Sequence, residues 1–142
     1  MDAVADELFV GTAADATDDS TLETHGVTTI VSLTHETLQS TRQGIDIRSI
    51  PFIHGPQHSR EQFRNAVEAT VVALETEGSV LVHCSAGASR SPAVAGTALA
   101  LSQGTELETA LQQVADNRDA VDPHEALLRQ AAHVYTQLNS GH

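Results

Sequence analysis

"LVHCSAGASRSP" occupies residues 81–92 and contains the only cysteine of the chain. The short apolar run before Cys84 predicts a buried strand, and the small residues after it predict a tight turn into a helix that starts near Arg90. Segments of strand and helix character alternate on both sides of this stretch. Such alternation predicts an α/β fold with a single open, mostly parallel sheet flanked by helices. Ligands bind such sheets at the carboxyl ends of the strands, where we expect Cys84 to lie.

The remaining elements follow from periodicity and from turn signals. Short β-branched or apolar runs predict strands over residues 7–11, 27–33, 45–52 and 79–84. Helical spacing of apolar residues predicts helices over 59–75, from about 90 to 103, from 105 to 117 and from 122 to 138. Thr105 and Glu108 have the spacing of a capping box, which sets the start of the third of these helices. The chain is short enough to form one domain over residues 1–142.

The composition limits the classes of partner. Nineteen acidic residues oppose seven arginines, there is no lysine, and the formal net charge is −12. This balance argues against nucleic acid and against an anionic membrane as partners, because both require a basic surface. Acidic residues without lysine resemble the composition of haloarchaeal proteins and suggest a halophilic protein. The chain has a lone cysteine, and it shows neither an apolar run of membrane-spanning length nor a secretory signal at its start. These features predict a cytoplasmic protein.

Residues around Cys84 suit the handling of a phosphate group. The small residues after it allow several backbone N–H groups to converge on one anion at the start of a helix: Ser85, Ala86, Gly87, Ala88 and Ser89. The positive helix end and Arg90 are expected to lower the pKa of the Cys84 thiol and hold it as a thiolate. A thiolate can attack phosphorus, and the guanidinium of Arg90 can bind two phosphate oxygens. Ser91 can donate a hydrogen bond to the sulfur when it leaves.

The segment "HCSAGASRS" at 83–91 matches the Cys-x5-Arg-Ser/Thr signature of the protein tyrosine phosphatases, and it most closely resembles their small dual-specificity branch. Nearly the whole chain can be aligned with that family through three further segments, "ELFVG" (7–11), "HGVTTIVSL" (25–33) and "NRDAVDPHEALLRQ" (117–130). The resemblance implies a phosphate-binding loop between the last strand and the following helix. It also implies hydrolysis of phosphotyrosine, with phosphoserine and phosphothreonine as further substrates, through a phosphocysteine. In this family the histidine before the cysteine, here His83, supports the loop.

One part of the family pattern is missing. The family places an aspartate, the general acid, on a loop about thirty residues before the cysteine, but here no carboxylate occurs from Ile47 to Arg60. His54 falls at about the aspartate position, and an imidazole can donate a proton near neutral pH. The open alternatives are an acid in the segment "DAVDPHE", namely Asp119, Asp122 or His124, a role for His58, or no dedicated acid at all. Asp122 also has the position of a helix N-cap.

Two further readings of the motif stay open alongside a phosphatase. The chain could be a pseudophosphatase that recognises phosphorylated partners, which the missing aspartate favours and the intact Cys84, Arg90 and Ser91 oppose. It could also be a sulfur-transfer or arsenate-reducing enzyme with a similar loop, although those place the motif near the N-terminus. The expected substrate is a phosphorylated protein or a small phosphomonoester. The eight histidines lack the paired spacing of a zinc site, so we expect no metal and no other cofactor, and the oligomeric state is left open.

Overall fold

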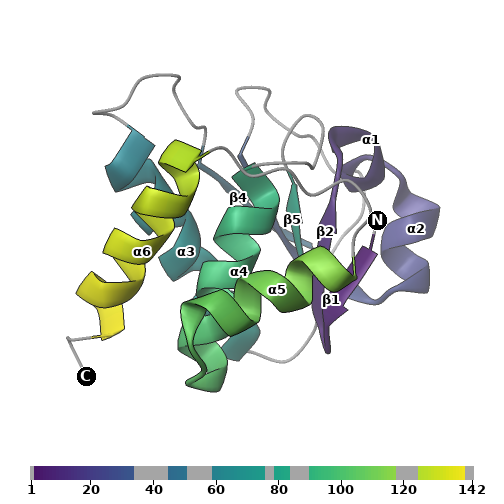
Figure 1. The fold of residues 1–142 in the computed structure, drawn as a ribbon. Coiled ribbons are helices and arrows are strands. Elements are labelled where there is room, and N and C mark those ends of the chain that lie inside the picture. Colours follow the sequence, from purple (N-terminus) through teal and green to yellow (C-terminus); the bar gives the residue numbers. More distant parts are fainter. Residues whose placement is uncertain are drawn as a thin grey trace.

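The computed structural model describes residues 2–33, 45–50, 59–75, 79–83, 90–117 and 125–139. Within these ranges the strands are β1 (Asp2–Ala5), β2 (Leu8–Gly11), β3 (Val27–Ser32), β4 (Asp46–Ser49) and β5 (Ser79–His83). The helices are α1 (Ala13–Ala16), α2 (Asp19–Thr24), α3 (Ser59–Glu75), α4 (Arg90–Gln103), α5 (Leu107–Asp116) and α6 (Glu125–Asn139). Figure 1 shows the strands running side by side as one layer between helices.

The strands form one sheet in the order β1-β2-β5-β3-β4. Neighbouring strands from β2 to β4 are parallel, and β1 pairs with β2 in the antiparallel direction. A single open, mostly parallel sheet flanked by helices is therefore confirmed. The sequence did not predict β1, whose turn into β2 places Glu7 at a positive φ of 66°. Glutamate rarely adopts a positive φ. The turn contains no glycine or proline, so the sequence carried no signal for it.

Each face of the sheet packs into a separate apolar cluster. The larger cluster joins one face to α3, α4, α5 and α6, and it contains Val10, Val31 and Val82. The smaller cluster joins the opposite face to α1 and α2, and it contains Phe9, Ile30 and Leu81. This division follows from strand alternation, because consecutive side chains point to opposite faces. No helix in the described ranges is long and apolar enough to cross a lipid bilayer.

Helix α4 is the centre of the larger layer. Every residue from 91 to 100 is buried, and the helix contacts α3, α5 and α6 as well as β2 and β5. Its residues are small, and Gly96 lies so close to α5 that a Cβ there would be 3.3 Å from the Cα of Leu111. Small side chains on α4 thus allow close packing of helices in a chain that is poor in aromatic residues.

The predicted capping box at the start of α5 is wrong. The helix begins at Leu107 with Glu106 as its N-cap, and no side chain caps it. Thr105 instead connects two other helices. Its N–H donates to the carbonyl of Ala100 at 3.0 Å, and its own carbonyl accepts from the Tyr135 hydroxyl at 2.9 Å. The first bond closes the end of α4 and the second is a tertiary contact with α6, and together they fix Thr105 in the turn between α4 and α5.

Candidate active site

The carboxyl ends of the three central strands lie level with one another. His83 at the end of β5 is registered with Gly11 of β2 on one side and with Ser32 of β3 on the other. Beyond the last β3 residue, the N–H of Leu33 donates to the carbonyl of His83 at 3.0 Å. Hydrogen bonds on this edge therefore continue to the residue that immediately precedes Cys84, so the backbone that carries the cysteine leaves the sheet from a fixed position.

Both ends of the predicted loop are placed by the fold. His83 ends β5, and Arg90 is the first residue of α4, which packs against β2 and β5. Cys84 and residues 85–89 between them lie outside the described residues, as does the side chain of Arg90. A strand that leads into a helix across six residues is the strand-turn-helix context that the motif requires. The context is therefore present, while the geometry of the loop itself stays a prediction.

Two of the predicted site residues are fully buried beside this loop. His83 has no exposed surface, and its side chain projects to the same face as Leu81 and Ser32, because residues two apart on a strand and registered partners share a face. Ser91 is also fully buried, in the first turn of α4. Burial of both polar residues next to the motif supports roles that are internal to the site rather than contacts with bulk solvent.

The first turn of α4 differs electrostatically from those of the other helices. Helices α1, α2, α3 and α5 each place a carboxylate there, respectively Asp15, Asp19, Glu61 and Glu108. The first turn of α4 carries none. Because a carboxylate at a helix N-terminus occupies the positive end of the helix dipole, its absence from α4 leaves that end free for an external anion. Among the five helices whose first turns are compared, the start of α4 is therefore the one without an acidic residue.

A second polar group lies at the carboxyl end of β2. Thr12 caps α1, and its N–H and hydroxyl donate to the carboxylate of Asp15 at 3.0 Å and 3.2 Å. Partial burial by itself would raise the pKa of Asp15, but the hydrogen bonds from Thr12 act in the opposite direction, and its pKa is lower than the ordinary 3.8. The carboxylate also lies over Gly11, where a Cβ would be 2.8 Å from its Oδ2. Gly11 therefore allows this close approach beside His83.

The remaining predicted site residues cannot be placed. His54, His58, Asp119, Asp122 and His124 all lie outside the described residues. Sequence reasoning did not single out Ser32, which is fully buried at the level of His83. Its only sequence signal is a polar residue at the end of an apolar strand. Within the described ranges, no group of three His, Cys, Asp or Glu side chains is arranged to hold a metal ion.

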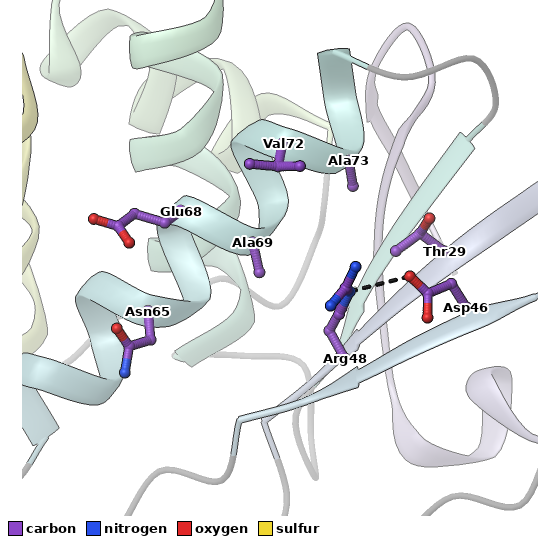
Figure 2. Close-up of a pocket in the computed structure, with 8 residues that line it drawn as sticks. All are labelled: Thr29, Asp46, Arg48, Asn65, Glu68, Ala69, Val72 and Ala73. Carbon is purple, nitrogen blue, oxygen red and sulfur yellow. Dashed lines mark ion pairs between the residues drawn. The ribbon is translucent and has the colours of Figure 1, made fainter.

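A separate cavity of about 310 Å³ lies along the outer strand of the sheet (Figure 2). It is bounded by β4 and α3, and residues from both elements and from β3 line it: Thr29, Asp46, Arg48, Asn65, Glu68, Ala69, Val72 and Ala73. None of the predicted site residues is among them. The cavity therefore belongs to a different part of the surface.

Comparison with known proteins identifies the same kind of fold and domain. Residues 8–137 match the family model "Dual specificity phosphatase, catalytic domain". The chain is 30% identical to mouse dual specificity phosphatase 28 over 125 residues, which cover 85% of this chain and 75% of the mouse protein. It spans between 31% and 75% of the length of the curated relatives that it matches.

Solved structures agree with these sequence matches. The crystal structure of human DUSP28 superposes with a TM-score of 0.88 at 25% identity, covering 100% of both chains. A mouse dual specificity phosphatase crystallised with zinc tungstate superposes with a TM-score of 0.88 at 26% identity, covering 99% of this chain and 89% of that one.

Proposed function

This chain belongs to the dual specificity phosphatase family, and we propose that it hydrolyses phosphotyrosine, together with phosphoserine and phosphothreonine, through a phosphocysteine intermediate. Family membership gives the chain the catalytic domain of a protein-tyrosine and dual-specificity phosphatase. The covalent intermediate, the residue roles and the substrate class are the parts that we propose. The single observation that supports them is that β5 ends at His83, directly before the motif cysteine, and that α4 begins at Arg90 with no acidic residue in its first turn.

The first chemical step transfers the phosphoryl group to sulfur. The thiolate of Cys84 attacks phosphorus, a bond forms between sulfur and phosphorus, and the bond from phosphorus to the leaving oxygen breaks. The guanidinium of Arg90 binds two equatorial oxygens, and the N–H groups of residues 85–90 bind the charge that develops on them. A general acid gives its proton to the leaving oxygen, which departs as a neutral alcohol or phenol.

The second step returns the enzyme to its starting state. Water attacks phosphorus, the sulfur–phosphorus bond breaks, and inorganic phosphate leaves while the thiolate of Cys84 is regenerated. The deprotonated general acid now accepts a proton from the water. Ser91 donates a hydrogen bond to the departing sulfur and so stabilises its negative charge. The full burial of Ser91 in the first turn of α4 supports this role, since a hydroxyl there is shielded from bulk water.

His83 is proposed as a supporting residue and not as an acid or a base. It is fully buried, its carbonyl is held by Leu33, and it directly precedes the nucleophile. A ring in this position can hydrogen-bond to the loop and keep it in the shape that stabilises the thiolate.

We propose His54 as the general acid, with Asp122 as the alternative. In the sequence, His54 falls at about the position of the family aspartate, and the stretch from Ile47 to Arg60 contains no carboxylate. The other composition-based expectations, a cytoplasmic location, adaptation to high salt and no nucleic-acid partner, remain predictions.

The experiment that tests the proposed function is hydrolysis of an aryl phosphate in molar KCl, with and without vanadate. We expect wild-type turnover that vanadate inhibits, and a loss of about 10³-fold or more in the Cys84→Ser protein, because a hydroxyl is a far weaker nucleophile than a thiolate. Ser102→Ala is the matched control, since it removes a hydroxyl from an exposed position near the other end of α4. It should retain the full rate.

The second candidate function is a module that binds phosphorylated partners without hydrolysing them. The missing carboxylate between Ile47 and Arg60 is the observation that favours it. A folded wild-type protein that binds vanadate but does not hydrolyse aryl phosphates would support this function and contradict the enzyme. Turnover that persists in the Cys84→Ser protein would contradict the cysteine mechanism.

A further inference from the structure

The sheet has an open edge along β4. This strand is the last in the sheet order, and it pairs only with β3 among the described strands. The N–H of Ile50 donates to the carbonyl of Ser32 at 2.8 Å, so the backbone groups of residues 46, 48 and 50 face β3. By the alternation of a parallel ladder, the N–H and C=O of Ile47 and Ser49 face outward. No other described strand pairs with these groups, so they can pair with a strand of another molecule.

Charged side chains alternate along this edge. Asp46 and Arg48 project to the α3 face, where Nε of Arg48 lies 3.0 Å from Oδ2 of Asp46, as the dashed line in Figure 2 shows. Both side chains are 59% exposed, so they are free to change partner. Ile47 between them projects to the opposite face, where it packs at the margin of the smaller apolar cluster and is only half-buried.

We propose that two copies of the chain associate by antiparallel pairing of their β4 strands across a two-fold axis at Ile47. In this register Ile47 pairs with Ile47 of the second copy, and the two residues exchange both of their outward backbone hydrogen bonds. Asp46 then lies directly opposite Arg48 of the second copy, and Arg48 opposite Asp46. The two-fold axis produces both ion pairs at once, so the strand is complementary to itself in charge.

Charge also selects this register over its neighbours. Outward-facing residues must pair with each other, so the register can shift only by steps that keep residues 45, 47 and 49 in contact. The next register in one direction places Arg48 opposite Arg48 of the second copy. The next in the other direction places Asp46 opposite Asp46. Both bring like charges directly together, which is unfavourable between adjacent strands.

The surroundings of β4 also suit a second copy. A second ion pair lies on the adjacent helix, where Nε of Arg64 is 3.0 Å from Oε1 of Glu68. The described charges next to the cavity therefore balance, in contrast to the net charge of −12 of the whole chain. An acidic protein is repelled least at such a neutral surface. Val72 lies on α3 at the same cavity and is 56% exposed. Within the described residues, it is the large apolar side chain that stays exposed to solvent.

The test is sedimentation equilibrium from micromolar to millimolar protein, in about 0.15 M salt, where the Debye length of about 8 Å screens the net charges more than contacts between strands. The wild type should reach a dimer as its concentration rises. Asp46→Arg and Arg48→Asp should each weaken association by about tenfold or more, because each places like charges opposite one another in both pairs. Glu106→Arg, a charge reversal on an exposed residue before α5, should leave the dimer unchanged.

An equimolar mixture of the two single variants isolates the proposed contact. In a dimer of one Asp46→Arg chain with one Arg48→Asp chain, arginine faces aspartate in both cross-strand pairs, while within each chain positions 46 and 48 carry like charges. We therefore expect the mixture to form a heterodimer that associates about tenfold or more tightly than either variant does alone. Circular dichroism of each variant establishes that it is folded.

Three outcomes would overturn the proposal. These are a wild type that stays monomeric at millimolar concentration, a dimer that both variants leave intact, and a mixture that stays monomeric although the wild type dimerises. In the first of these cases, binding of an unrelated extended peptide at β4 would assign the edge to a different partner. None of these outcomes depends on phosphatase activity.

Discussion

The fully buried polar side chains of the described residues fall into two groups by position. The hydroxyls of Thr70 and Thr97 donate to carbonyls one turn earlier in their own helices, each at 2.8 Å, and therefore belong to the helix interior. Ser32, His83 and Ser91 lie instead where strands β3 and β5 end and where α4 begins. Polar groups concentrated at one edge of an apolar sheet are typical of a functional site, since burying them elsewhere costs stability.

The sequence predicted two members of the second group and missed the third. His83 and Ser91 were identified because they flank a cysteine and an arginine at a fixed spacing. Ser32 had no such neighbour, and its place beside His83 depends on the register of β3 with β5, which residues about fifty positions apart determine. The general acid was not predictable in the same way, because the family aspartate is absent and the candidates come from two separate stretches of the sequence.

The proposed role of His54 predicts a dependence on the leaving group. His54→Asn should lower the rate by about 10²- to 10⁴-fold for alkyl and phenyl phosphates, because their oxygens need a proton to depart, and by much less for p-nitrophenyl phosphate. In the wild type, kcat/KM should fall as pH rises above about 6.5, the ordinary pKa of a histidine that must be protonated to act. Asp122→Asn is the comparison, and an equal loss for all leaving groups in His54→Asn would contradict the role.

Among the elements, the short helix α1 depends on its capping box. Partial burial alone would raise the pKa of Asp15, but its pKa in the folded protein is lower than the ordinary 3.8, because Thr12 donates two hydrogen bonds to the carboxylate and the positive N-terminus of the chain attracts it. A lowered pKa means that the charged form stabilises the fold, so this contribution is fully present above the unfolded pKa and is lost as pH falls through the folded one.

The change that tests this contribution is Asp15→Asn, followed by urea denaturation from pH 7 down to pH 3. We expect the variant to be less stable near neutral pH, and the difference in unfolding free energy between the two proteins to shrink as pH falls below about 4. A difference that stays constant over this range would show that the charge of Asp15 has no part in capping.

The contact between α4 and α5 requires a residue without a side chain at position 96, which is glycine. A Cβ on Gly96 would lie 2.5 Å from Cδ2 of Leu111 and 3.3 Å from its Cα. The Leu111 side chain can rotate away, but its backbone can only shift as part of α5. Gly96→Ala should therefore destabilise the fold by about 1–2 kcal/mol, since the strain of overpacking exceeds the gain of about 1 kcal/mol in helix propensity.

The control for this contact is Leu111→Ala, alone and combined with Gly96→Ala. Removal of the leucine side chain eliminates the 2.5 Å contact, so the alanine at position 96 should cost clearly less in the Leu111→Ala background. Chemical denaturation of the four proteins measures this coupling. Additive effects of the two substitutions would contradict a direct contact.

Helices were more predictable than their boundaries. The apolar spacing of residues 59–75 predicted α3 with the bounds that the structure has, because one face of the helix must cover the sheet. The capping signal at Thr105 failed, since a hydrogen bond that closes the end of α4 and a tertiary hydrogen bond from α6 determine where that residue lies. Strand β1 was missed because its four residues show neither a β-branched run nor a turn signal before β2.

For the whole molecule, the alternation of strands and helices predicted a mostly parallel sheet, but not the order of its strands. The sheet places β5 at its centre and β1 and β4 at its edges. Parallel neighbours bring the chain back to the same end of the sheet each time, so the segments that follow β2, β3, β4 and β5 all start there. The segment that follows β4 and the segment that follows β5 therefore leave the sheet at the same end, although about thirty residues separate these two strands.

The two edges of the sheet differ in a way that limits growth. At β1 the pairing with β2 is irregular between Ala3 and Ala5, and the side chain of Gln113 on α5 donates to the carbonyl of Val4 at 3.0 Å. A bulged strand with an occupied carbonyl is a poor template for another strand, whereas β4 has no such cover among the described residues. A sheet that can extend at one side only can be joined once. Two molecules joined at β4 would present only their β1 edges, which are poor templates for a further strand. Association would therefore stop at the dimer and not continue into fibres.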